Sequence, residues 1–97
     1  MNYVQELAGE IFLAVHGKPM PDSEQPLYLI YAVLGLAVGA SATPEQVHDA
    51  WSAWACTREP GHPCLRPFDE LTATVREKDQ PFAAAIRAVM ERRGRGA

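Results

Sequence analysis

The fold is decided by residues 27–40, which read LYLIYAVLGLAVGA and include fourteen consecutive residues without a charge. Such a run is too short to cross a bilayer, which needs about 20 apolar residues, so it indicates a buried helix. Because apolar residues occupy nearly every side of it, we predict a central helix over residues 23–39. Two explanations stay open for the surplus apolar surface: either the other helices surround this one, or part of it contacts a second copy or a partner protein.

Hydrophobic spacing predicts three further helices, over residues 2–16, 44–57 and 80–93. In the first, apolar residues recur at i, i+3, i+4 and i+7 from Val4 onward. The second begins with Thr43, Pro and, three residues after the threonine, Gln, which is the pattern of a capping box. The helices therefore have recognisable starts as well as apolar faces.

The stretch between the last two helices contains two prolines and is predicted to be extended over residues 62–74, with a single helical turn at 73–77. No part of the chain alternates in the manner of a strand. We therefore predict an all-α fold, a compact bundle of four helices with an extended, Pro-containing segment between the third and fourth helices.

The length of 97 residues fits a single domain, residues 1–97, and the apolar content of 47% excludes a disordered chain. Arg92, Arg93 and Arg95 make residues 92–97 a basic tail, but the net charge of −3 and the pI of about 5.5 argue against nucleic acid as a partner. The N-terminus lacks the positive region of a signal peptide. We expect a cytoplasmic protein with two free thiols and no membrane segment.

Two histidines and two cysteines, His48, Cys56, His62 and Cys64, are the soft metal ligands that lie near one another. Their spacing lacks the Cys-x₂₋₄-Cys pairs typical of structural zinc sites. We therefore predict two buried thiols and two hydrogen-bonded histidines, with no metal and no cofactor. A Cys–His hydrolase would also need an oxyanion hole and a strand-to-helix nucleophile turn, so the chain is not expected to be an enzyme.

Trp51 and Trp54 are the largest side chains of the third predicted helix. We expect Trp54 to lie in the core. His48 lies one turn before Trp51, so the two side chains share a helix face and would be able to stack on and hydrogen-bond a planar ligand.

The segments QVHDAWSA at 46–53 and HPCLRPFDEL at 62–71, with the charged turn at 75–79, resemble the ryanodine-receptor repeat (RyR) domain. Over residues 46–89 the chain has that family's His-x-x-Trp helix, its His-Pro-x-Leu-x-Pro-aromatic-x-x-Leu segment and a further helix. Short bacterial and actinophage proteins are similar over the same stretch. Frequent alanine and a preference for arginine over lysine are typical of GC-rich bacteria and their phages.

The resemblance implies a mostly helical binding module. Paired repeats in the large eukaryotic channels bind adenine nucleotides and drug-like ligands by stacking the motif tryptophan on the ring, and bacterial members have been proposed as sensors of nucleotide-derived ligands. By this resemblance Trp51 would stack on the ligand, and His48, His62 and Pro63 would line the cleft. Arg58 is a candidate for a basic contact.

The sequence thus predicts a non-catalytic module for a nucleotide-derived small molecule. In the channel repeats a long aromatic and basic loop precedes the His-Pro segment, whereas only ten residues separate Trp51 from His62 here. This short loop, the apolar central helix and the basic tail support an alternative. In that alternative the chain is a phage or bacterial interaction domain that acts on a host protein, with a homodimer as one form.

Overall fold

Four long helices make up most of the chain within residues 1–96, which are the residues that the computed structural model describes. No strand occurs in this part of the chain, so the predicted all-α fold is confirmed. A short helix and three 3₁₀ turns complete the fold. The elements are α1 (Tyr3–His16), η1 (Asp22–Glu24), α2 (Gln25–Val38), η2 (Gly39–Ser41), α3 (Pro44–Arg58), η3 (Phe68–Glu70), α4 (Ala73–Glu77) and α5 (Gln80–Gly96).

The helix ends follow from local chemistry. The predicted capping box of α3 is present, because Gln46 N–H donates to Thr43 Oγ1 at 3.2 Å and Thr43 N–H donates to Gln46 Oε1 at 3.0 Å. Helix α1 ends at Gly17, whose φ of 71° is a left-handed conformation that a side chain disfavours. The helix α2 begins two residues later than predicted, because residues 22–24 form the turn η1 instead.

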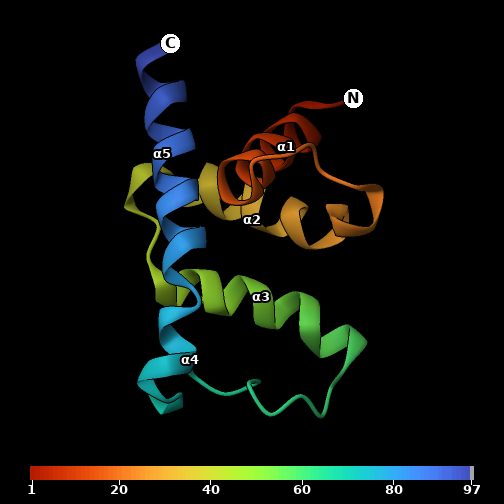
Figure 1. The fold of residues 1–97 in the computed structure, drawn as a ribbon, viewed down its shortest axis with the longest axis vertical. Coiled ribbons are helices and arrows are strands. Elements are labelled where there is room, and N and C mark those ends of the chain that lie inside the picture. Colours follow the sequence, from red (N-terminus) through yellow and green to blue (C-terminus); the bar gives the residue numbers. More distant parts are fainter. Residues whose placement is uncertain (97) are drawn as a thin grey trace.

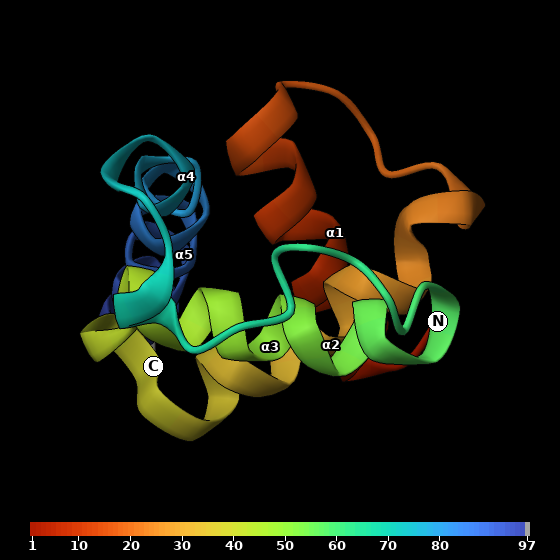
Figure 2. The same cartoon turned by 90° about the horizontal axis from the view of Figure 1, so that it is seen from below.

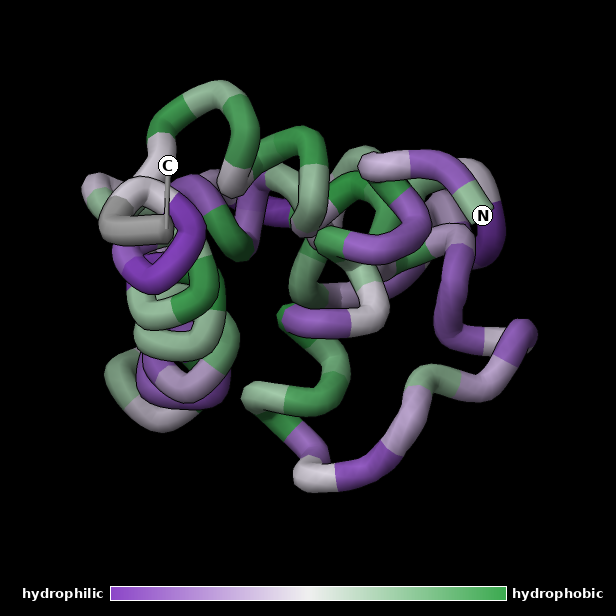
Figure 3. The backbone as a smooth tube through the Cα atoms, turned by 90° about the horizontal axis from the view of Figure 1, so that it is seen from above, coloured by the Kyte–Doolittle hydropathy of each residue, from purple (hydrophilic) through white to green (hydrophobic). Residues whose placement is uncertain are grey.

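Helix α2 is the middle layer of the molecule, as predicted. It packs against α1 on one side and α3 on the other, and α5 runs across all three helices (Figure 1). The core draws on all four long helices: its largest fully buried side chains are Leu7, Ile11, Tyr28, Val47, Ile86 and Val89. The connection from α1 to α2, residues 17–24, is mainly hydrophilic and lies apart from the helices (Figure 3).

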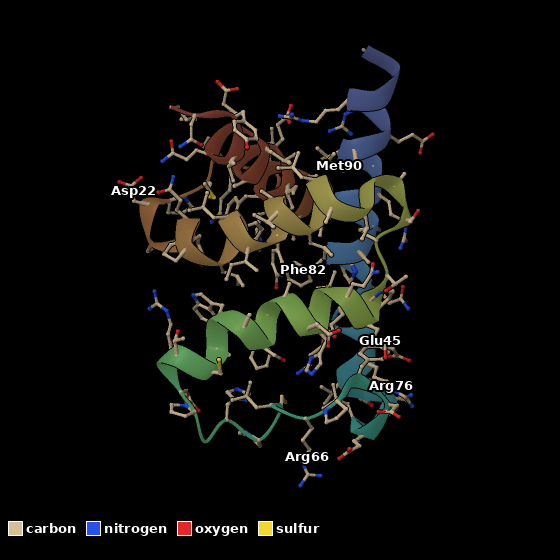
Figure 4. The ribbon with its side chains drawn as sticks, turned by 180° about the vertical axis from the view of Figure 1, so that it is seen from behind. Asp22, Glu45, Arg66, Arg76, Phe82 and Met90 are labelled. Atoms are coloured by element: carbon tan, nitrogen blue, oxygen red, sulfur yellow. The ribbon has the colours of Figure 1, made fainter. Side chains whose placement is uncertain are left out.

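Close contact between α2 and α5 depends on a glycine. A Cβ at the buried Gly35 would lie 3.2 Å from Met90 Sδ, inside ordinary contact distance, so the missing side chain lets the two helices approach. Phe82, which also belongs to α5, points toward the space between α2 and α3 (Figure 4). Arg87 Nη1 donates to the Ala42 carbonyl at 2.8 Å and ties α5 to the start of α3.

The end of α5 differs from the prediction. The helix continues to Gly96 rather than stopping at residue 93, so residues of the predicted basic tail form its last turns. Arg93 Nε donates to Glu10 Oε2 at 2.6 Å and so joins α5 to α1. Ala97 and the side chain of Arg95 lie outside the described residues.

Part of the apolar surface of α2 is left uncovered within the chain. Val33 is 56% exposed and Leu36 is 45% exposed.

Among the described residues, no helix combines the length and the hydrophobicity that crossing a bilayer requires.

Candidate functional site

The segment between α3 and α4, residues 59–72, lies along α3 and forms one wall of the candidate site (Figure 2). His48, which is only 3% exposed, holds it there: its Nε2 lies 2.7 Å from the backbone oxygen of Arg66. Because a carbonyl oxygen only accepts, Nε2 must carry the hydrogen. Phe68 from the same segment packs against the His48 ring, with 6.1 Å between ring centroids. The His-x-x-Trp histidine is therefore a structural anchor for the His-Pro segment.

A pocket of about 320 Å³ opens between α2, α3, this segment and the start of α5. Its volume is near the lower end of the range for small-molecule sites, about 300–1,000 Å³, so it suits a ligand of one or two rings. Most of the lining is aromatic or aliphatic, with a few polar groups. The lining residues are Leu27, Tyr31, His48, Trp51, His62, Cys64, Val75, Lys78, Asp79 and Phe82.

The Trp51 ring is held by two histidine rings. His48 is stacked on it, with 5.7 Å between centroids and 24° between planes, and His62 meets it edge-on at 5.0 Å and 77°. The indole is half-buried and also packs against the core, so its orientation is fixed before any ligand arrives. A fixed aromatic ring with part of its surface in a pocket is suited to stacking on a planar ligand.

The predicted site residues separate into two groups. His48, Trp51 and His62 come together in the pocket lining. Pro63 lines a neighbouring groove, which shares His62 with the pocket. Arg58 lies away from the pocket, with its guanidinium carbon 5.0 Å from the centroid of the Trp54 ring. Trp54 itself is half-buried and outside the core cluster, so the prediction that it is a core residue is wrong. Arg58 shields its ring through a cation–π contact.

Sequence reasoning missed seven of the ten described lining residues, among them Tyr31 on α2, Asp79 before α5 and Phe82 on α5. Tyr31 and Phe82 carried the pattern of core positions, and Asp79 carried the pattern of a helix cap. The Tyr31 ring packs between Tyr28 and Phe82, at centroid distances of 5.1 and 5.8 Å. No local signal marks these residues as pocket-lining, because the pocket exists only where α2, α3 and α5 meet.

Tyr31 and Asp79 are two of the polar residues that line the pocket. Burial raises the pKa of the Asp79 carboxyl, and the nearby His48 lowers it by a smaller amount. The pKa of Tyr31 is raised chiefly by burial, then by Tyr28 and by the Asp79 charge. Within the described residues, neither the Tyr31 hydroxyl nor the Asp79 carboxylate has a hydrogen-bond or salt-bridge partner.

The position of the Tyr31 oxygen follows from its burial. The residue is only 2% exposed, yet no described side-chain oxygen or nitrogen is both sealed from solvent and unpaired. The unpaired Tyr31 oxygen must therefore reach accessible space, and the pocket that Tyr31 lines provides it.

The family model described as "Domain of unknown function (DUF7701)" matches residues 2–91. The chain belongs to the DUF7701 family. The match includes every residue of the pocket lining and all of the first three long helices. It does not connect this DUF7701 chain to the RyR repeat. No curated protein and no solved structure matches the chain.

Of the two cysteines and two histidines considered as metal ligands, His48, His62 and Cys64 of this DUF7701 chain line the pocket and Cys56 does not. Cys56 is exposed and Cys64 half-buried, so the prediction of two buried thiols is wrong, while both thiols are free as expected. Both histidines are hydrogen-bonded, as predicted: His62 Nδ1 accepts from the Cys64 backbone N–H at 3.0 Å. Among the described residues, no group of three or more histidine, cysteine or acidic side chains is arranged to hold a metal ion.

Proposed function

We propose that this DUF7701 protein is a non-catalytic module that binds a small planar, nucleotide-like ligand in the Trp51 pocket. The observation that supports it best is the pocket beside a fixed, half-buried indole. The aromatic lining supplies apolar contact area, and the few polar groups supply orientation, which is the usual composition of a small-molecule site.

The resemblance to the RyR repeat adds to this proposal at particular residues. The motif tryptophan, Trp51, faces the pocket together with the two motif histidines, His48 and His62. The His-Pro segment closes the same pocket because His48 anchors it through the Arg66 carbonyl. In this chain the contacts beyond the tryptophan come from α2 and α5 rather than from a long loop.

The binding role is favoured over Cys–His chemistry by the orientation of His62. Its Nδ1 already accepts the Cys64 backbone N–H, so this nitrogen is not available as a base toward the Cys64 thiol. The lining groups then serve to hold a ligand, while His48 Nε2 donates to the backbone oxygen of Arg66.

Calorimetric titration with a panel of nucleotides tests the proposal. Trp51→Ala should weaken binding about 5- to 150-fold, because stacking of a base on an aromatic side chain contributes about 1–3 kcal/mol. Trp54→Ala is the matched control, since Trp54 is a half-buried tryptophan of the same helix that does not line the pocket. The proposal fails if no nucleotide binds the wild type, or if the two variants lose the same affinity.

Protein interaction is a second candidate function, favoured by the exposed apolar positions Val33 and Leu36 on α2. A groove beside Val33, shared with Val4 and Leu29, continues this surface toward α1. The partner would be a host protein or a second copy of the chain. Light scattering of wild type and Leu36→Glu tests the second copy: a dimer that the variant dissociates supports it, and a monomeric wild type at high concentration contradicts it.

A further inference from the structure

Two polar groups of the pocket lining have no partner among the described residues of the chain. The Asp79 carboxylate has only acceptor oxygens, and the Tyr31 hydroxyl has one hydrogen to donate. Both side chains line the same pocket, and Tyr31 is only 2% exposed. Because neither group has a partner among the described residues, a ligand in the pocket is able to supply one to each of them.

The charges of the lining restrict what that ligand presents. A carboxylate repels ring nitrogens that carry lone pairs and attracts adjacent N–H groups, which it accepts two at a time. When the Tyr31 hydroxyl donates its hydrogen to the ligand, the ligand must present an acceptor there, such as a carbonyl oxygen. The complementary edge is therefore a carbonyl followed by a ring N–H and an exocyclic amino group.

From this we infer that the DUF7701 pocket is selective for guanine-type rings, with Asp79 accepting from the ring N–H and the amino group and Tyr31 donating to the carbonyl. The inference rests on the proposed stacking of a planar ligand on Trp51 and adds the identity of the ring edge. Adenine-type rings have a lone pair where guanine has its N–H, so the carboxylate disfavours them. Hypoxanthine keeps the carbonyl and the N–H but lacks the amino group.

The lining also places the rest of such a ligand. Lys78 is exposed and, among the described residues that line the pocket, is the side chain with a permanent positive charge. A phosphate group is therefore expected at the solvent side near Lys78, while the base edge enters toward Asp79. A phosphate close to Asp79 would be repelled by the carboxylate charge.

The test is calorimetric titration of the full chain with the 5′-monophosphates of guanosine, inosine, adenosine and xanthosine. The wild type should bind the guanosine compound most tightly, by about 5- to 150-fold over the adenosine compound, the discrimination typical of a bidentate base contact. Asp79→Asn should remove this preference. Because an amide offers one acceptor and one donor, and xanthine has a carbonyl in place of the amino group, this variant should gain affinity for the xanthosine compound.

Two further variants separate a recognition role from a general loss of structure. Asp49→Asn removes an exposed carboxylate of α3 that does not line the pocket, and it should leave all four affinities unchanged. Tyr31→Phe removes only the hydroxyl, and it should weaken the guanosine and inosine compounds about 2- to 13-fold while sparing the adenosine compound.

The outcomes distinguish this inference from the proposed function. If nucleotides bind in a Trp51-dependent manner but the wild type shows no preference for the guanosine compound, the guanine assignment is wrong and the proposed function stands. The same holds if Asp79→Asn leaves the preference unchanged. If none of the four compounds binds, both are overturned.

Discussion

Replacing His48 tests the geometry on which the pocket depends. The His48 ring is almost fully buried, and its Nε2 donates to the Arg66 carbonyl at 2.7 Å across 18 positions of sequence. His48→Phe keeps an aromatic ring between Trp51 and Phe68 but removes the donor. Because the carbonyl that remains is only partly buried, we expect a loss of about 1–2 kcal/mol in the free energy of unfolding. In a domain of this size that corresponds to a fall of about 4–16 °C in Tm.

Two variants at and beside this position serve as controls. His48→Gln retains an N–H donor of similar reach and should lose less stability than His48→Phe. Ser52→Ala removes a contact to the same Nε2 that measures 3.5 Å, at the limit of a hydrogen bond, so it should change the free energy of unfolding by less than about 0.5 kcal/mol.

Urea unfolding followed by circular dichroism measures these differences, and amide hydrogen exchange locates them. In His48→Phe the N–H groups of Cys64 and Leu65, which are bonded to His62 within the segment, should exchange faster than in the wild type, and by a larger factor than the N–H of Val47 near the start of α3. The anchoring role is refuted if His48→Phe is as stable as the wild type and its segment exchanges at the wild-type rate.

Three further substitutions have defined expectations. Gly17→Ala should lower the free energy of unfolding by about 1–2 kcal/mol in urea titrations, because alanine is strained at φ of 71°; equal stability would contradict this. Asp79→Asn should stabilise the unliganded protein at pH 7, since burial raises the Asp79 pKa in the folded state and the wild type therefore loses stability as pH rises above about 4. Thermal scans should show this advantage disappearing below about pH 4, and a less stable variant at pH 7 would refute it. Arg93→Gln should lose no more than about 1 kcal/mol, and less in high salt, because its ion pair with Glu10 is substantially exposed.

The fold could be predicted from sequence because its signals are local. The capping box of α3 lies within four consecutive residues, Thr43 to Gln46, and the uncharged run at 27–40 by itself indicates a central helix. The errors occurred where tertiary contacts act. Its large side chain predicts a core position for Trp54, whereas its ring lies outside the core cluster, beneath Arg58. Helix α5 extends beyond residue 93 in a stretch where Arg93 pairs with α1.

The sequence motifs identify three of the ten described residues that line the pocket and miss the other seven. His48, Trp51 and His62 were found because they belong to motifs within one short region of the chain. Tyr31 and Asp79 are 48 positions apart and acquire a shared role only when α2 and α5 pack together. Each also had a sufficient local explanation, one as an apolar helix position and the other as a residue that precedes a helix.

The unpaired groups of the pocket connect stability to function. Partial burial of the Asp79 carboxylate disfavours its charged form and so lowers the stability of the unliganded protein at neutral pH. A chain of 97 residues has a small core and little stability to spare, so such groups are expected where a ligand completes their hydrogen bonds. It follows that Asp79→Asn should move two measurements in opposite directions, raising the stability of the free protein while weakening its preference for a guanine-type ligand. A residue that served the fold alone would lower stability when replaced.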